Sequence, residues 1–197
     1  MSLDQYFISK MQDIYAEFKA YDASQSERLD RYRNIEPESA YFLAMLIRIQ
    51  QSKRILEIGT STGYSTLWLA DAAQVTQAKL ITLEIDPNRT VKAQHYAKEL
   101  KLDHFIDFRV VDAGLFLQSC RQKFDFIVLD AERDAYVDYW VYLQHLLEPK
   151  GGVLIIDNVI SHAHEVQAIL ELIENDSRFI STTLTIGAGL LMVTFKD

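Results

Sequence analysis

Apolar positions along this chain repeat with two different periods, and these periods predict helices and strands. Phe7, Met11 and Ile14 recur at helical spacing near the N-terminus, so an amphipathic helix is expected there. A second helix is expected over 37–50, because this stretch is rich in apolar residues and begins with a proline, which suits the first helical position. Both helices precede any strand, so residues 1–50 are predicted to form a helical cover over a later sheet.

From residue 53 onward, short apolar runs alternate with helical segments. The runs that predict strands are 54–58, 80–85, 105–111, 124–129, 153–156, 179–186 and 190–195. The segments that predict helices are 64–73, 87–100, a short one from 113, 135–147 and 164–174. Such alternation is typical of right-handed parallel crossovers. Residues 53–197 are therefore expected to form a doubly wound α/β core, and the whole chain, 1–197, a single domain.

The last two apolar runs predict an exception to the parallel arrangement. Only Gly187, Ala188 and Gly189 separate the last two predicted strands, 179–186 and 190–195. So short a connection joins two strands as a hairpin, and one of them must run antiparallel to its neighbours. The sheet is therefore expected to be mostly, but not wholly, parallel.

Composition and charge narrow the classes of function. The 197 residues suit one domain, and the formal net charge of -8 disfavours nucleic acid as an obligate partner, because phosphate binding needs a basic face. The single cysteine, Cys120, excludes an intrachain disulfide and fits a reducing compartment. No apolar run approaches the ~20 residues of a membrane span, and no signal peptide is evident. We expect a cytoplasmic protein without a membrane partner.

The loop after the first predicted strand is a candidate ligand site. In a doubly wound sheet, ligands bind beyond the carboxyl ends of the strands. Gly59 and Gly63 lie in the stretch 57–65, between strand and helix, where glycine lets a ligand approach the backbone. The dinucleotide fingerprint G-x-G-x-x-G would need glycines where Ser61 and Tyr64 stand, which weakens a nicotinamide cofactor. A tight turn without any ligand stays open as the alternative.

Acidic residues follow the second and third predicted strands. Glu84 closes an apolar strand, and a carboxylate there can accept both hydroxyls of a ribose. Asp86 precedes a proline and is interpreted as a helix cap. Asp112, before Ala113, serves equally well as a helix cap or as a contact to an adenine. These positions predict a nucleotide-like ligand across the edge of the sheet.

Three oxygen-bearing side chains follow the fourth and fifth predicted strands. Asp130 ends one strand, and Asp157 and Asn158 end the next, so adjacent parallel strands would bring them together. Hard oxygen ligands of this kind suit Mg²⁺ or a similar cation. A simple turn made by the Asp157 and Asn158 side chains is the open alternative. His162 and His164 are two positions apart and do not share a helix face, so we expect a loop or helix start rather than zinc there.

The stretch ILEIGTSTGYSTLWLA resembles the cofactor loop of the cation-dependent O-methyltransferases, which include the catechol and caffeoyl-coenzyme A O-methyltransferases and bacterial relatives. The resemblance continues through YFLAMLIRIQQSKRILEIG, LITLEID, VVDA, FDFIVLDAERDAYVDYW and LLEPKGGVLIIDN. It covers nearly the whole chain from about Asn34. It implies the seven-stranded sheet of class I methyltransferases, with an antiparallel last strand. It also implies transfer of a methyl group from S-adenosylmethionine to a small hydroxylated substrate, assisted by a divalent cation.

The resemblance also implies roles for individual residues. The residues implied to hold the amino acid part of S-adenosylmethionine are Glu57, Gly59, Thr60, Gly63 and Ser65. Those implied to hold the rest of this cofactor are Glu84 at the ribose, Asp112 and Ala113 at the adenine, and Asp130 beside it. The implied metal ligands are Asp130, Asp157 and Asn158. Relatives are often dimers, so a homodimer is among the expected assemblies.

One departure from the family bears on the mechanism. The family usually has lysine, the candidate proton acceptor, where this chain has Arg133, and arginine stays protonated. A cation can lower the pKa of a bound hydroxyl, so that little base is needed. Asp130, as a metal ligand beside the cofactor, and Arg133, which would stabilise a negative charge, are therefore taken as the catalytic residues. The stretch 159–162 also departs from the family, so no particular substrate is carried over. The alternatives are a metal-independent methyltransferase, a non-catalytic S-adenosylmethionine-binding or scaffold protein, and a nucleotide-dependent oxidoreductase.

Overall fold

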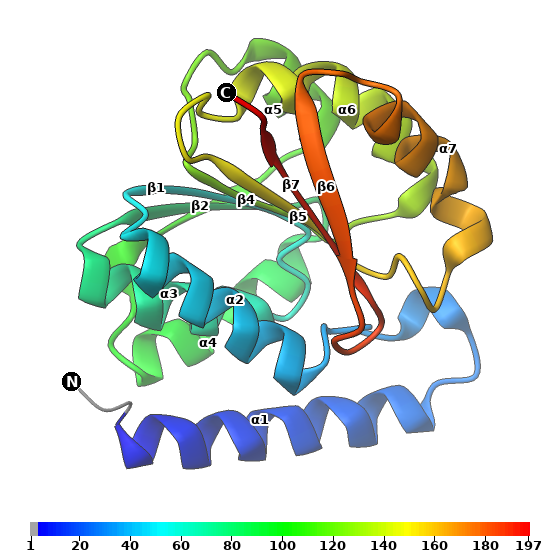
Figure 1. Ribbon diagram of the computed structural model, residues 1–197. Helices are drawn as coiled ribbons and strands as arrows, with labels where there is room; N and C mark the ends of the chain where they lie inside the picture. The colour runs from blue at the N-terminus through cyan, green and yellow to red at the C-terminus, as the bar shows by residue number, and fades with distance from the viewer. Residues whose placement is uncertain (1–3) are drawn as a thin grey trace.

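A seven-stranded sheet lies between two layers of helices in the computed structural model, which describes residues 4–197 (Figure 1). The strands are β1 (Arg54–Ile58), β2 (Lys79–Glu84), β3 (Ile106–Val110), β4 (Phe126–Leu129), β5 (Val153–Ile156), β6 (Phe179–Leu184) and β7 (Leu190–Phe195). The helices are α1 (Gln5–Ser24), α2 (Pro37–Gln50), α3 (Tyr64–Thr76), α4 (Pro87–Glu99), α5 (Ala113–Ser119), α6 (Tyr136–Leu146) and α7 (Ala163–Glu174). Three short 3-10 helices are η1 (Arg28–Asp30), η2 (Asp103–Phe105) and η3 (Arg133–Ala135).

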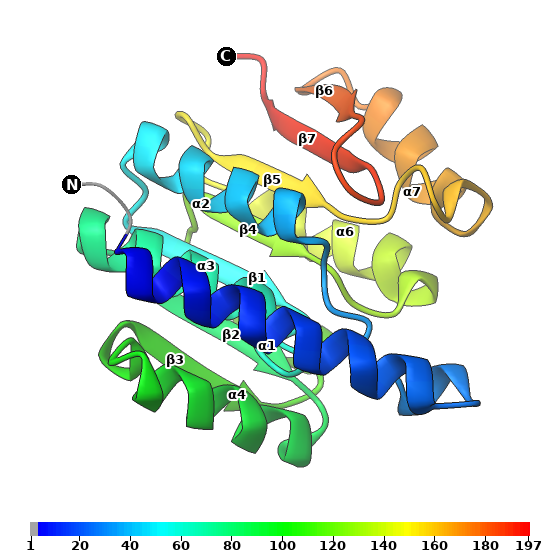
Figure 2. The same cartoon turned by 90° about the horizontal axis from the view of Figure 1, so that it is seen from below.

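The order of the strands confirms the doubly wound arrangement. Across the sheet they run β3-β2-β1-β4-β5-β7-β6 (Figure 2). The first five are parallel to one another, and β7 runs antiparallel to both β5 and β6. The predicted hairpin is therefore present, and β7 is its antiparallel strand. The chain order reverses between β1 and β4, so the switch point where such sheets bind ligands lies at the carboxyl ends of these two strands.

The central strands are buried on both faces because both layers of helices cover them. All four residues of β4 are buried. Phe126 and Val128 belong to the core on the α1–α4 side, while Ile127 and Leu129 belong to the core on the α5–α7 side. This is the alternation that a pleated strand imposes. Burying each of these side chains contributes about 1.5–3 kcal/mol, so the strands that carry the site are firmly held.

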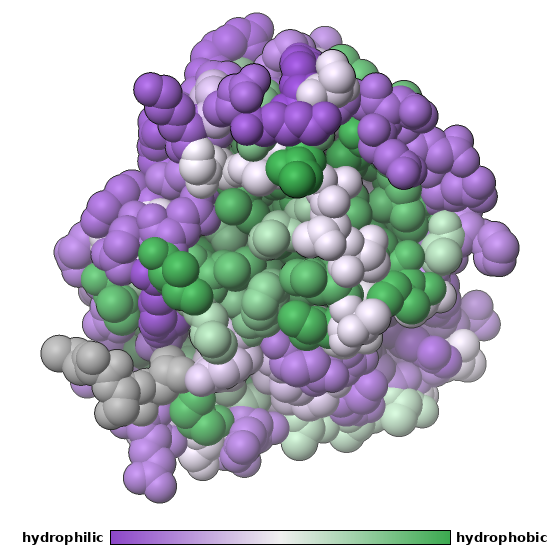
Figure 3. Space-filling model, viewed as in Figure 1, coloured by the Kyte–Doolittle hydropathy of each residue, from purple (hydrophilic) through white to green (hydrophobic). Residues whose placement is uncertain are grey.

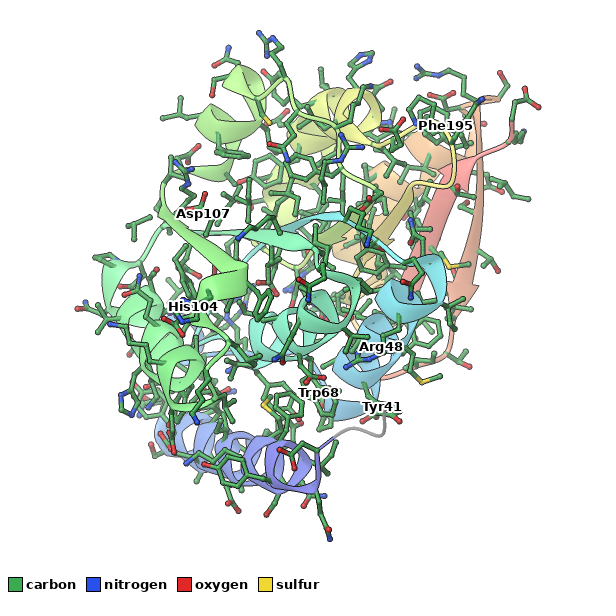
Figure 4. The ribbon with its side chains drawn as sticks, turned by 90° about the vertical axis from the view of Figure 1, so that its left-hand side faces the viewer. Tyr41, Arg48, Trp68, His104, Asp107 and Phe195 are labelled. Carbon is green, nitrogen blue, oxygen red and sulfur yellow. The ribbon has the colours of Figure 1, made fainter. Side chains whose placement is uncertain are left out.

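The N-terminal helices pack on α3 and complete one face of the sheet. Trp68 on α3 meets Phe7 of α1 and Tyr41 of α2 edge to face, with ring centroids 5.1 and 5.4 Å apart respectively (Figure 4). Arg48 of α2 forms an ion pair with Asp71 of α3. The predicted helical cover is thus joined to the core by aromatic contacts and by an ion pair. The connection that follows α1 lies near the carboxyl ends of the strands.

Apolar side chains gather on the outer surface over α2 and the neighbouring strands (Figure 3). Met45 and Ile49 on α2 and Ile180 on β6 are exposed. A homodimer stays a prediction. None of the helices within residues 4–197 combines the length and the apolar character needed to cross a bilayer.

Candidate active site

A cavity of about 250 Å³ opens at the switch point of the sheet. Residues from the loops after β1 to β5, and from the connection between α1 and α2, line it together. Its lining includes Tyr32, Arg33, Gly59, Ser61, Glu84, Arg89, Asp112, Ala113, Asp130, Glu132, Arg133, Tyr139 and Asn158. The sequence-based prediction of a site at this edge therefore agrees with the position of the cavity.

The loop after β1 is shaped by two glycines in the left-handed region. Gly59 has φ +105°, and a Cβ added there would lie 1.8 Å from the carbonyl oxygen of Asp130. Gly63 has φ +95°, and a Cβ there would lie 2.7 Å from Cβ of Ala93 on α4. Neither position accepts a side chain without movement of its neighbours. Gly59 lets the loop lie directly against the end of β4, where the cavity begins, and Gly63 lets the start of α3 approach α4.

Glu57 lies behind this loop rather than in the cavity. Its carboxylate is fully buried and accepts hydrogen bonds from the hydroxyls of Ser65 (2.5 Å), Thr66 (2.5 Å) and Thr82 (2.6 Å). The structure thus differs from the expectation that Glu57 faces the cofactor, because three hydroxyls converge on its side chain from α3 and β2. Of the five residues expected at the amino acid part, Gly59 alone lines the cavity. The members of the set that lie outside its lining are Glu57, Thr60, Gly63 and Ser65.

Replacing Glu57 by glutamine is expected to change how stability depends on pH. Burial raises the pKa of Glu57 from 4.5 to about 7, against the effect of the three hydroxyl hydrogen bonds. A carboxyl whose pKa is raised by folding stabilises the protein below its unfolded pKa, and this contribution is lost as pH rises through the folded pKa. Relative to wild type, Glu57→Gln should gain about 2 kcal/mol of unfolding free energy between about pH 5.5 and about pH 8.5.

Denaturant titration of both proteins at the two pH values measures this gain. Other titrating groups are common to the two chains, so they largely cancel in the comparison. A free-energy difference between the variant and wild type that stays constant with pH would contradict a buried, protonated Glu57.

Glu84 joins the loops that follow β1 and β2. One carboxylate oxygen accepts the backbone N–H of Ser61 at 2.8 Å, and the other accepts those of Ile85 at 2.9 Å and Asp86 at 3.0 Å. Each carboxylate oxygen has further lone pairs. Glu84 also lines the cavity, so it is held in a fixed orientation with acceptor capacity left for a ligand. Asp86 caps α4 through the N–H of Asn88 at 2.8 Å, which confirms its predicted capping role.

The far end of the cavity is formed at the start of α5. Asp112 caps this helix by accepting the N–H of Leu115 at 2.9 Å. Asp112 and Ala113 also line the cavity, together with the ring of Tyr139 from α6. Asp112 is therefore a helix cap that also forms part of the cavity wall, and its contact with an adenine stays a prediction.

Asp130, Asp157 and Asn158 form a cluster, the acidic trio, where β4 and β5 end. Asp130 and Asn158 line the cavity, while Asp157 is buried outside its lining. The side-chain amide of Asn158 donates to Oδ1 of Asp130 at 3.0 Å and to Oδ2 of Asp157 at 3.2 Å. Burial and the neighbouring Asp157 carboxylate hold the pKa of Asp130 well above its usual range, although Arg33 and Arg133 oppose this. Burial likewise raises the pKa of Asp157 to about 6. Two carboxylates are thus held together without enough positive charge between them.

These three side chains fit a divalent cation. Oδ1 of Asp157 is buried and has no hydrogen-bond partner, so an acceptor faces inward unsatisfied. Asn158 carries a carbonyl oxygen as well as its NH₂ group, and it is held in the left-handed region at φ 69°. Within residues 4–197, no three histidine, cysteine, aspartate or glutamate side chains are grouped so that they could hold a metal ion. A cation at this position would therefore rely on the amide oxygen of Asn158 as well as on the two carboxylates.

Arg133 lies in η3, next to the acidic trio. It is 7% exposed, and its Nε donates to Oε2 of Glu165 on α7 at 2.9 Å. It lines the cavity, and its charge lowers the pKa of Asp130. A guanidinium in this position stays charged and cannot accept a proton. It can only stabilise a neighbouring negative charge or donate hydrogen bonds.

The connection between α1 and α2 supplies residues that the sequence analysis did not identify. Tyr32 and Arg33 line the cavity from this segment. Arg89 of α4 holds the segment in place by donating to the carbonyl oxygens of Leu29 at 2.9 Å and Arg31 at 3.0 Å. No motif or spacing marks these residues, because contacts between distant parts of the chain bring them to the site.

Comparison with known proteins gives a consistent set of relatives. A family model described as O-methyltransferase matches residues 23–195. The chain is 34% identical over 131 residues to a catechol O-methyltransferase of Niastella koreensis, covering 64% of this chain but only 58% of that protein. It is 29% identical over 159 residues to a catechol O-methyltransferase of Mycobacterium tuberculosis, covering 80% of this chain and 70% of that one. The crystal structure of the O-methyltransferase from Bacillus cereus in complex with SAH is similar with a TM-score of 0.79 and 25% identity, covering 100% and 93% of the two chains.

Proposed function

Because the chain belongs to the O-methyltransferase family, we propose that it transfers a methyl group from S-adenosylmethionine to a hydroxyl of a small substrate, assisted by a divalent cation. The observation that carries this proposal is the cavity at the switch point of the sheet. Its lining brings together the glycine loop, Glu84, Asp130 and Asn158. We propose that the whole of 1–197 acts as one methyltransferase domain, with residues 1–50 as its helical cover.

The cofactor is assigned to the part of the cavity that the loops after β1, β2 and β3 line. Glu84 would accept the ribose hydroxyls, and Asp112 and Ala113 would flank the adenine beside Tyr139. Gly59 would lie nearest the amino acid part, supported from behind by Glu57. SAH, the product that S-adenosylmethionine leaves after methyl transfer, is bound in the Bacillus cereus relative, which supports this assignment.

The cation is assigned to Asp130, Asp157 and Asn158. The unsatisfied oxygen of Asp157 and the raised pKa of Asp130 support this assignment, because both features indicate missing positive charge. When bound, the cation would supply charge that favours the ionised form of the substrate hydroxyl. Asp130 lines the same cavity as the cofactor residues, so it would place the cation next to the methyl donor.

The protein's own contribution to the reaction is mainly alignment. A sulfonium methyl group is already activated, so the rate depends on holding the substrate oxygen, the methyl carbon and the sulfur in line. Gly59 and Asp130, in direct backbone contact, would position donor and acceptor relative to each other. Arg133 would stabilise negative charge on the substrate without taking its proton.

Removal of divalent cations is expected to abolish methyl transfer. The test follows transfer from S-adenosylmethionine to catechol by purified protein, with EDTA and then with excess Mg²⁺ restored. The account predicts loss of activity with EDTA and its recovery with Mg²⁺, because the cation would favour the ionised hydroxyl. Activity that is insensitive to EDTA would favour a metal-independent methyltransferase. Binding of S-adenosylmethionine without transfer to any hydroxylated acceptor would favour a non-catalytic binding protein.

A further inference from the structure

Three arginines form ion pairs with only two glutamates at the edge of this cavity. Arg28 and Arg33, from the connection between α1 and α2, both pair with the carboxylate of Glu132, Arg28 at 3.2 Å. Arg133 pairs with Glu165 at 2.9 Å. Three guanidinium groups therefore pair with two glutamate carboxylates, and Glu132 is shared between two arginines.

Arg33 is held toward the cavity by an unusual backbone conformation. Its φ is 53°, in the left-handed region, which is costly for a residue other than glycine. The side chain of Asp22 stabilises this conformation by accepting the backbone N–H of Tyr32 at 2.6 Å and that of Arg33 at 3.0 Å. Strained backbone that its surroundings fix in this way is typical of binding sites.

The guanidinium of Arg33 has donors to spare. Its Nη2 bonds to Glu132, while its Nε is buried without a hydrogen-bond partner. A guanidinium carries five N–H donors in a planar fork. Arg33 lines the cavity, so it can offer hydrogen bonds to a molecule bound there.

Arg33 and Arg133 approach the acidic end of the cavity from different parts of the chain. Both line the cavity that Asp130 and Asn158 also line. Arg28, by contrast, is outside the lining of this cavity and its side chain is 53% exposed.

We propose that Arg33 and Arg133 bind a carboxylate group of the substrate, so that the preferred acceptors are small hydroxylated acids rather than neutral catechols. This inference rests on the proposed methyl transfer and names the substrate class of the same site. The planar fork of arginine matches the two oxygens of a carboxylate.

The test compares two acceptors that differ in charge but little in shape: 3,4-dihydroxybenzoate and 3,4-dihydroxybenzamide. The kcat/KM of each is measured for wild type, Arg33→Gln and the matched control Arg28→Gln, with S-adenosylmethionine and Mg²⁺ saturating. Wild type should prefer the acid. Arg33→Gln should reduce kcat/KM for the acid about ten- to a hundredfold, because it removes a hydrogen bond to a charged group. It should reduce kcat/KM for the amide less than about twofold. Arg28→Gln removes the other arginine that pairs with Glu132, and it should leave the preference for the acid unchanged.

Several results would overturn the proposal: no preference for the acid in wild type, an equal loss on both acceptors in Arg33→Gln, or the same loss in Arg28→Gln. If neither acceptor is methylated although SAH binds, the acid is titrated calorimetrically onto the SAH complex. Binding that weakens in Arg33→Gln then supports the carboxylate site, and absence of binding overturns it. Failure to bind SAH at all would instead refute the proposed function on which the inference rests.

Discussion

Replacing Asp130 by alanine is expected to reduce methyl transfer about a hundredfold or more while leaving the fold intact. Asp130 would hold the cation and also borders the cofactor, so its loss would disturb both the charge at the substrate oxygen and the alignment of the reacting atoms. Burial and the neighbouring Asp157 carboxylate both raise the pKa of Asp130, so keeping both carboxylates ionised is unfavourable. Removing one of them should therefore maintain or raise the melting temperature. Steady-state transfer assays and thermal unfolding of the same preparation measure both effects.

Glu84→Ala is the control that separates catalysis from cofactor binding. Glu84 lines the cavity and holds three backbone N–H groups, so its loss should mainly raise the KM for S-adenosylmethionine. The Asp130 variant should lose kcat instead. Full activity of Asp130→Ala with any acceptor would contradict the assignment of the cation to the acidic trio.

Replacing Gly59 by alanine is expected to abolish cofactor binding and to destabilise the protein by about 2 kcal/mol or more. An added Cβ would lie 1.8 Å from the carbonyl oxygen of Asp130 and 2.7 Å from its carbonyl carbon. The loop after β1 and the end of β4 would have to separate, and both border the cavity. Calorimetric titration with SAH and denaturant unfolding measure the two effects.

Gly151→Ala provides a matched control for backbone strain. Gly151 also has a positive φ, +73°, but a Cβ there would meet no atom within 4 Å. This variant should lose about 1 kcal/mol of stability from strain alone and should bind SAH as wild type does. Equal SAH affinities for the Gly59 and Gly151 variants would show that contact between the loop and β4 does not shape the cofactor site.

Much of the fold is predictable from the sequence because strands buried on both faces leave continuous apolar runs. The predicted bounds of β1, β5 and β7 agree with the structure residue for residue. The helix predicted over 64–73 extends to Thr76, since its alanine-rich end is buried against the core. The predicted run 179–186 ends earlier, at Leu184, where the hairpin turn begins.

The candidate site was predictable only where it follows the strands. Asp130 and Asn158 could be found because parallel strands bring their carboxyl ends to one edge. The orientation of Glu57 was also recoverable, because side chains alternate along β1: Leu56 and Ile58 pack on the α5–α7 side, and Glu57 faces the other way, toward α3.

Arg33 could not be predicted in the same way. Its position depends on Asp22, eleven residues earlier, and on Glu132, ninety-nine residues later. Neither contact leaves a periodic or local signal in the sequence. The residue proposed to bind the substrate's carboxylate is thus one that only the structure reveals.

The most direct test of the central claim is calorimetric titration of the purified chain with SAH, in the presence and absence of Mg²⁺. The account predicts saturable binding that is lost in Gly59→Ala, and a separate binding event for Mg²⁺ that is lost in Asp157→Ala. If SAH does not bind under either condition, the chain is not an S-adenosylmethionine-dependent enzyme and the proposed function is wrong.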